Sequence, residues 1–199
     1  MAREKLDTEI RQEQIAQAAL SLIASRGIRG LSVAAVARRV GLVPSGIYRH
    51  FAGKDEVLSI ALDYIGERLL ANVHAAAADT ADPLERLRRL LLRHVGMLRQ
   101  NQGILRIMFS EDAYGDRPAR RTKVLRMIQA YVEAIAGIVR DGQREQRLRS
   151  DADPHTVALM FLGLIQPAAI LWHMSDGTFD VTEHCEKAWT ILARAIAAR

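Results

Sequence analysis

Small and polar residues are concentrated in the segment from Leu31 to Leu58, which reads LSVAAVARRVGLVPSGIYRHFAGKDEVL. Pro44 suits the first turn of a helix, because its missing N–H would have no intrahelical partner there. The free N–H groups at such a helix start attract a phosphate, and the small side chains of Ser45 and Gly46 allow close approach to the edges of bases. The chemistry that this segment indicates is non-covalent binding of nucleic acid.

Two short helices position these small residues. Apolar residues follow a helical rhythm up to Gly41, which ends the first helix, and a second helix begins at Pro44. Ser32 stands where the N-cap of the first helix belongs. The two helices, joined by residues 40–43, form a helix-turn-helix, in which the first helix braces against the DNA backbone and the second enters the major groove.

Helical periodicity continues along the whole chain, and nothing in the alternation of residues argues for a strand. Ala, Leu and Arg recur, whereas there are only 5 Pro and 13 Gly, a composition that favours helices. We predict an all-α protein with an N-terminal three-helix domain and a larger C-terminal helical domain, about nine helices in total. They are expected over residues 8–26, 33–40, 44–50, 54–78, 83–100, 103–109, 118–147, 153–173 and 181–198, with Thr8 capping the first helix and Gly27 ending it.

The excess positive charge lies at the N-terminal end of the chain. Residues 1–54 hold 9 Lys and Arg against 4 Asp and Glu, whereas residues 55–199 hold 19 of each kind. A basic segment on a neutral body is typical of a DNA-binding module joined to a partner or ligand domain, although charge alone leaves a solvated basic face as an alternative. We expect a DNA-binding domain over residues 1–53 and a ligand-binding and dimerisation domain over residues 54–199.

The patterns of common catalytic sites do not occur in this sequence. GxxxxGK, GxGxxG, HExxH and GxSxG are missing, and Gly41 to Gly46 has the first Walker spacing but continues with Ile-Tyr. The single cysteine, Cys185, allows neither an internal disulfide nor a two-cysteine metal site. The histidines show no metal spacing. We therefore expect no enzyme, no cofactor and no metal, with an all-helical enzyme as the least favoured alternative.

Three short patterns carry a resemblance to a known family. They are A-x-x-x-G at Ala37 to Gly41, I-Y-R-H-F at Ile47 to Phe51 and K-D-E-V-L at Lys54 to Leu58. Together they resemble the DNA-binding domain of the tetracycline-repressor (TetR) family. The resemblance covers about the first quarter of the chain, and the rest matches the family only in the order and length of its helices.

The resemblance implies roles for individual residues. Tyr48, His50 and Lys54 would contact DNA phosphates, and Ser32 would bind an oxygen of the DNA backbone. Arg49 would reach either a base or a phosphate. The alternatives are that Tyr48 belongs to the core of the small domain, that His50 is an ordinary surface histidine and that Lys54 is a solvated lysine. Phe51 is expected in the core. The positions that contact bases in the family are occupied by Val43, Pro44, Ser45 and Gly46.

One position departs from the family pattern. Val43 stands where the family often has a small hydroxyl residue that caps the recognition helix, so Pro44 must help to fix the start of that helix. The predicted base-reading face is also poor in hydrogen-bonding groups. We expect part of the sequence readout to come from apolar contact with thymine methyl groups or from DNA shape.

A helix-turn-helix of this size covers only a half-site, so we expect a homodimer on a palindromic operator. The resemblance implies that the last two helices pack against their two-fold mates as a four-helix bundle, and burial within one monomer is the alternative. The predicted interface residues are Val157, Phe161, Leu164, Ile165, Ala168, Trp172, Cys185, Trp189, Leu192 and Ile196.

Adaptable apolar residues in the middle of the chain indicate a pocket for a hydrophobic or amphipathic small molecule. Ordinary core packing is the alternative for each of them. The predicted function is a repressor that such a ligand releases from DNA. The alternative hypothesis is a DNA-binding regulator or architectural protein without an effector. The predicted pocket residues are Met97, Met108, Phe109, Met127, Tyr131 and Met160.

We expect a cytoplasmic protein without a membrane span. The N-terminal sequence MAREKLDTEI is polar and lacks the apolar stretch of a signal peptide. The longest apolar tract, residues 157–172, is interrupted by Gln166 and Pro167 and is shorter than the roughly 20 residues that a membrane helix needs.

Overall fold

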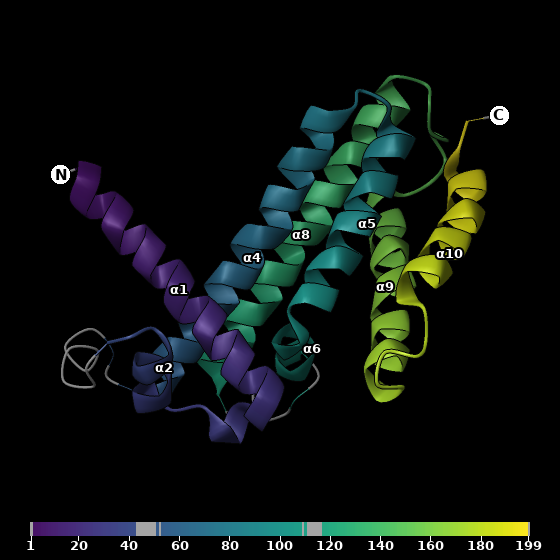
Figure 1. Cartoon of the computed structure of the whole chain (residues 1–199). Coiled ribbons are helices and arrows are strands. Elements are labelled where there is room, and N and C mark those ends of the chain that lie inside the picture. The colour runs from purple at the N-terminus through teal and green to yellow at the C-terminus, as the bar shows by residue number, and fades with distance from the viewer. Residues whose placement is uncertain (1, 43–50, 52, 109, 111–116, 199) are drawn as a thin grey trace. The chain divides into compact units, whose positions relative to one another are not determined.

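The chain is helical in almost all of its described parts (Figure 1). A computed structural model describes residues 1–199 except 1, 43–50, 52, 109, 111–116 and 199, and describes side chains from Arg11 onward. No strand occurs among the described residues, which confirms the all-α prediction. The elements are α1 (Ala2–Arg26), the 3-10 helix η1 (Ile28–Gly30), α2 (Val33–Arg39), α4 (Lys54–Asp79), α5 (Pro83–Gln100), α6 (Gln102–Met108), α8 (Pro118–Arg144), α9 (Pro154–Met174) and α10 (Val181–Ile196).

The helix boundaries agree closely with the periodicity, with two exceptions. α1 begins at Ala2 and not at Thr8, because residues 2–6 are Ala, Arg, Glu, Lys and Leu, all strong helix formers. α8 ends at Arg144, three residues early, where Gln146 adopts a positive φ of 57°. The predicted helix over residues 44–50 lies outside the described residues.

The described chain forms two compact units. Unit 1 comprises residues 1–67 and 101–125, and unit 2 comprises residues 68–100 and 126–199. α4 and α8 each contribute residues to both units. The functional boundary after residue 53 stays a prediction.

Unit 1 is built around α1, which packs against η1, α2 and α6. Ile15, Ala19 and Ile23 form its buried stripe. The contact with α6 is so close that a Cβ atom on Gly103 would lie 2.2 Å from the carbonyl oxygen of Leu20. Glycine is therefore the residue that lets these two helices meet.

Unit 2 buries its core between α5, α8, α9 and α10. α10 packs against α5 and α9, and Phe161 and Trp189 are buried there. The Sγ atom of Cys185 is also buried and donates to the carbonyl oxygen of Leu164 at 3.5 Å. Burial raises the pKa of this thiol to about 11.

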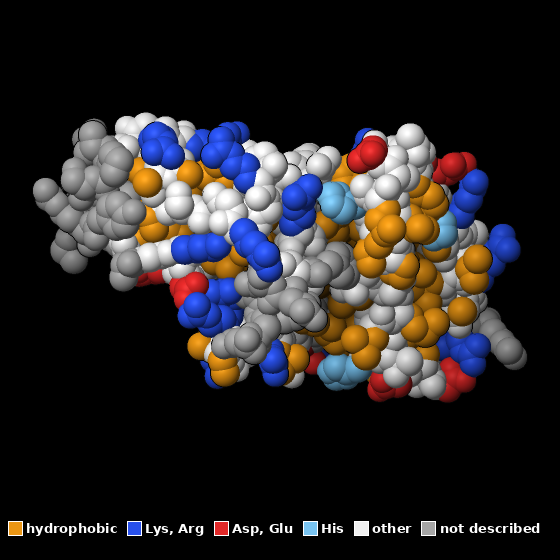
Figure 2. Space-filling model, turned by 90° about the horizontal axis from the view of Figure 1, so that it is seen from below, with side chains coloured by type: hydrophobic (Ala, Val, Ile, Leu, Met, Phe, Trp, Pro, Cys, Tyr) orange, Lys and Arg blue, Asp and Glu red, His pale blue; other side chains and the backbone are white. Residues whose placement is uncertain are grey.

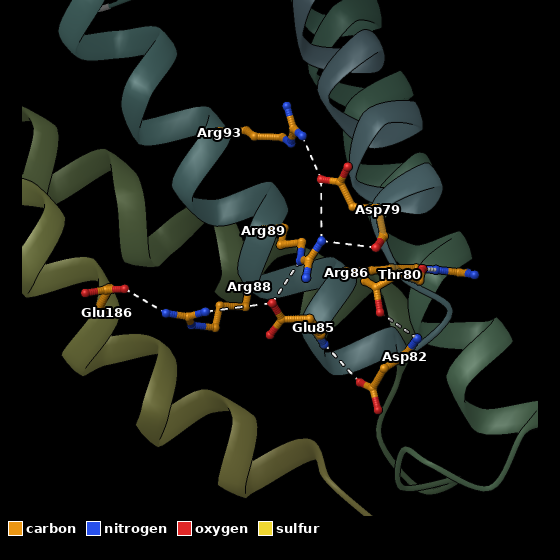
Figure 3. A network of polar contacts seen from close by, with 9 residues as sticks. All are labelled: Asp79, Thr80, Asp82, Glu85, Arg86, Arg88, Arg89, Arg93 and Glu186. Atoms are coloured by element: carbon orange, nitrogen blue, oxygen red, sulfur yellow. Dashed lines mark hydrogen bonds and ion pairs between the residues drawn. The ribbon is translucent and has the colours of Figure 1, made fainter.

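An ionic network holds the corner between α4 and α5 in unit 2 (Figure 3). Asp79, at the end of α4, pairs with Arg93 at 2.6 Å, and Arg89 donates to the backbone carbonyl of Asp79 at 3.1 Å. Arg88 extends the network to Glu186 on α10 at 2.9 Å. These side chains are solvated, so each pair contributes little to stability, and the network mainly defines the direction in which α5 leaves the corner.

Among the described residues, one helix, α9, is long and apolar enough to cross a membrane by length and composition. Its length is 21 residues, because the helix continues beyond both ends of the apolar tract. α9 packs against α5 and α10 within unit 2, and its Phe161 and Ile165 are fully buried. One face of α9 therefore belongs to the core of unit 2, and its other face is exposed.

Candidate nucleic-acid interface

α2 begins with the predicted cap. The Oγ atom of Ser32 accepts a hydrogen bond from the backbone N–H of Ala35 at 3.2 Å, which satisfies one of the unpaired donors at the helix start. Val33, Val36 and Ala37 form the buried face of α2, which packs against α1. Ser32 itself is exposed, so its hydroxyl is accessible beside the cap.

The turn after α2 explains the spacing between Ala37 and Gly41. Leu42 donates its N–H to the carbonyl of Ala37 at 2.8 Å, and Gly41 donates to the carbonyl of Arg38 at 3.4 Å. These two bonds form a Schellman motif, which needs a positive φ at its turning residue, and Gly41 has a φ of 72°. Ala37 is fully buried. The chain therefore leaves α2 in a defined direction toward residue 43.

The predicted recognition helix follows this turn. Val43, Pro44, Ser45, Gly46, Tyr48, Arg49 and His50 lie outside the described residues, so their roles stay predictions. Phe51, which comes next, is 8 % exposed and lies in the core as expected.

Lys54 is the first residue of α4 and is half-buried, and the next residue is held by two arginines. The carboxylate of Asp55 pairs with Arg117 at 2.8 Å and with Arg120 at 2.7 Å. One turn farther along α8, Lys123 pairs with Asp63 of α4 at 2.6 Å. These pairs join the start of α8 to the start of α4 and thereby position the backbone at Lys54.

Three basic residues at the start of α8 were not predicted as part of the interface: Arg117 directly precedes the helix, and Arg120 and Lys123 lie within it. They recur every third residue, at 117, 120 and 123, and Asp55, Ser59 and Asp63 recur every fourth residue on α4. Residues at such spacings share one face of a helix, so the two oppositely charged rows can lie opposite each other when the helices pack. Figure 2 shows Lys and Arg side chains spread over the surface of unit 1. Arg26, Arg29, Arg38 and Arg39 are among its exposed cations.

The residues predicted to form a ligand pocket are distributed over several places. In unit 2, Met97 and Tyr131 are buried and Met127 is half-buried, whereas Met160 is 50 % exposed on α9. Met108 is half-buried in unit 1, and Phe109 lies outside the described residues. Among the described residues of this set, Met97, Met127 and Tyr131 are the ones that lie in unit 2 and are buried or half-buried.

The structure adds His94 to this interior group. Its Nδ1 atom lies 3.1 Å from the hydroxyl oxygen of Tyr131, and the two rings are tilted with centroids 5.4 Å apart. Burial lowers the pKa of His94 to about 4 and raises that of Tyr131, so both side chains are neutral at pH 7. His94 falls on the apolar stripe of Leu87 and Leu91, which is the sequence signal that marks it as a core residue.

Most residues predicted at a dimer interface are buried within the chain itself. They bind α9 and α10 to each other and to the rest of unit 2, so they belong to the core of the protomer, and the opposite faces of these helices are exposed. Leu164 and Trp172 are half-buried. The buried ones are Val157, Phe161, Ile165, Ala168, Cys185, Trp189, Leu192 and Ile196.

A capped helix that ends in a glycine turn before a predicted recognition helix, within an all-α chain, defines the class of helix-turn-helix DNA-binding regulators. Residues 15–59 match the family described as "Bacterial regulatory proteins, tetR family". Residues 80–196 match the "Tetracyclin repressor-like, C-terminal domain" family. The chain belongs to the TetR family and is a DNA-binding transcriptional regulator.

Individual relatives agree with this assignment. The nucleoid occlusion factor SlmA of Vibrio vulnificus is 24% identical over 94% of this chain and 95% of its own. The fatty acid degradation regulator FadR of Bacillus halodurans has a TM-score of 0.80 at 20% identity, over 92% of this chain and 94% of its own. The FadR regulator of Bacillus subtilis, solved in complex with stearoyl-CoA, has a TM-score of 0.76 at 21% identity, over 91% of this chain and 97% of its own.

Proposed function

We propose that this regulator is a homodimeric, cytoplasmic repressor without enzymatic activity, which a small apolar or amphipathic ligand releases from a palindromic operator. The observation that carries the proposal is an apolar surface on α9 and α10 that the single chain leaves uncovered. One helix-turn-helix reads only a half-site, so a regulator of this size needs a two-fold mate.

The uncovered surface forms a stripe along α9. Met160, Gly163, Pro167, Leu171 and Met174 follow one another at intervals of three or four residues, and all are exposed. Met174 is 77 % exposed, and a Cβ on Gly163 would meet nothing within 4 Å. Figure 2 shows hydrophobic side chains gathered over the part of unit 2 that holds α9 and α10. Leu159 on α9 and Ile191 on α10 widen the stripe.

Replacing Leu171 with Glu should convert the dimer into a monomer, because a partner would have to bury an unpaired carboxylate. Analytical ultracentrifugation should show the change in mass, and operator affinity should fall at least 100-fold. Leu125→Glu, at a similarly exposed leucine of α8 in unit 1, is the matched control and should remain dimeric. A Leu171→Glu variant that stays dimeric would contradict the proposed interface.

The proposed DNA-contacting residues are Ser32, Lys54 and the recognition segment with Val43, Pro44, Ser45, Gly46, Tyr48, Arg49 and His50. Replacing Lys54 with Ala should weaken binding to all DNA sequences about equally. It should also lower the slope of log K against log salt by about 1 for each half-site, because one phosphate contact releases one counterion. Filter-binding titrations between 50 and 300 mM salt (roughly the range over which such slopes are resolved) measure this slope.

Lys187→Ala supplies the control for the salt experiment. Lys187 lies on α10 in unit 2, is exposed and pairs with Glu183 at 2.7 Å. Its loss removes the same charge from the chain and should leave the slope unchanged. If both variants change the slope equally, the effect is one of net charge, and Lys54 does not contact a phosphate.

The ligand response is tested by two steps on the full chain. Sequences bound from a random DNA pool should contain a palindrome whose half-sites lie about one helical turn apart. A screen for small molecules that release this DNA then identifies the effector. The complex of the B. subtilis relative with stearoyl-CoA supports an apolar ligand in this fold.

The name of the curated relatives favours a second candidate function. That name, nucleoid occlusion factor, refers to the nucleoid, and in this second candidate function the chain would bind DNA there without a small-molecule effector. Footprinting separates the two functions, since a repressor protects a short palindrome near a promoter. Protection of many dispersed sites, with no release by any small molecule, would favour the second candidate.

A further inference from the structure

His94 on α5 and Tyr131 on α8 place two polar groups in the core of unit 2. Among the described residues, His94 is the one charged or strongly polar residue that is buried, with 8 % of its surface exposed. Met97 lies almost one turn from His94 on α5, and Met127 lies one turn from Tyr131 on α8. The pair is therefore flanked by side chains that adapt their shape easily.

The pair has unused hydrogen-bonding capacity. The bond between Nδ1 and the Tyr131 hydroxyl uses one donor and one acceptor, and either histidine tautomer then leaves an N–H or O–H donor over. No second hydrogen bond of either side chain is found in the described structure. Every fully buried side-chain nitrogen or oxygen of the described residues has a partner, so the Nε2 atom of His94 must face accessible space.

The surroundings of the His94–Tyr131 pair favour an uncharged ligand group over an ion. A neutral imidazole and a neutral phenol offer hydrogen bonds but no positive charge. No lysine or arginine side chain is buried in the described part of unit 2 to balance an anion. Burying a carboxylate or an ammonium group there would be costly, whereas a carbonyl or hydroxyl oxygen would satisfy the leftover donor.

We infer that Nε2 of His94 and the hydroxyl of Tyr131 bind the neutral oxygen of a mainly apolar ligand, such as a ketone or an alcohol. The inference rests on the proposed ligand response and specifies the chemistry of the ligand. Apolar contact with Met97 and Met127 supplies most of the affinity, and the His94–Tyr131 pair orients the molecule.

The test uses four straight-chain probes of ten carbons (roughly the length that fills a small pocket), namely 2-decanone, 1-decanol, decanoate and decylamine. Calorimetric titration at pH 7.5 measures their affinity for the full-length wild type, Tyr131→Phe and His94→Leu. The ketone and the alcohol should bind the wild type at least tenfold more tightly than the two ions. Each variant should bind the neutral probes about fivefold more weakly, the loss of one hydrogen bond.

Thermal denaturation shows whether each variant is folded, and Tyr131→Phe keeps the volume of the ring. Preference for decanoate or decylamine, equal affinities of wild type and variants, or no binding of any probe would overturn the inference. Operator release is measured separately. Neutral probes that bind through His94 but leave DNA bound would refute the ligand-released repressor, whereas release that is unaffected by both variants would refute only the role of this pair.

Discussion

Replacing Gly103 with Ala should lower the free energy of unfolding by about 3 kcal/mol, the upper part of the range for overpacked interiors. The added Cβ would lie 2.2 Å from the carbonyl oxygen of Leu20 and 2.9 Å from its carbon. Both atoms belong to the backbone of α1, so no side chain can rotate away and the two helices must separate. Chemical denaturation of the full chain measures the change.

Gly96→Ala is the matched control for this prediction. Gly96 lies inside α5, and a Cβ there would meet nothing within 4 Å. Alanine in a helix interior should stabilise the protein by about 0.5 to 1 kcal/mol, so the two Gly→Ala changes should have opposite signs. Similar values for both would show that α1 and α6 do not meet at Gly103. Operator binding should weaken in Gly103→Ala alone, since α1 also supports α2.

Acidification should destabilise the protein through His94. Its pKa is about 4 in the folded chain, against an ordinary value of 6.5, so the unfolded chain takes up the proton more readily. Stability from this group is complete above about pH 6.5 and is lost as the pH falls toward 4. The full loss amounts to about 3 kcal/mol, from 1.36 kcal/mol for each pKa unit.

Denaturation curves of wild type and His94→Leu between pH 7.5 and 4 measure this loss. Asp79, Glu133 and Asp153 have lowered pKa values because of their side-chain hydrogen bonds, so their contributions are lost at lower pH in both proteins. The difference between the two curves isolates the histidine. The variant should be the less sensitive of the two between pH 6.5 and 4, and parallel curves would mean that His94 is not buried in the neutral form.

Local signals predicted the parts of the fold whose causes are local. α5 runs over residues 83–100, as its apolar spacing predicts, and Ser32 caps α2 through a bond to a residue three positions away. Gly41 has the positive φ that its place after α2 requires. Each of these features depends on neighbours within one or two turns, so periodicity and capping preferences are sufficient to predict it.

The helix faces that pack against each other, and the contacts between distant residues, could not be predicted from local sequence patterns. α9 is apolar on nearly all sides, so its periodicity does not tell which face meets its own chain, and the predicted interface residues Phe161 and Ile165 turned out to be buried. Asp55 and Arg117 are 62 residues apart, and only the packing of α4 against α8 brings them together. His94 lies on the apolar stripe of α5, but neither its burial nor its hydrogen bond to Tyr131 on α8 was predicted.

The burial of the one cysteine in the chain makes the protein well suited to spectroscopic distance measurements. The Cys185 thiol is shielded and stays protonated at neutral pH, so maleimide or methanethiosulfonate reagents should leave it unmodified. A new cysteine at the exposed position of Ser25 or Arg29 in unit 1 would then carry a spin label without removal of the natural thiol. Two such labels in a dimer would report the distance between its two DNA-binding domains, with and without effector.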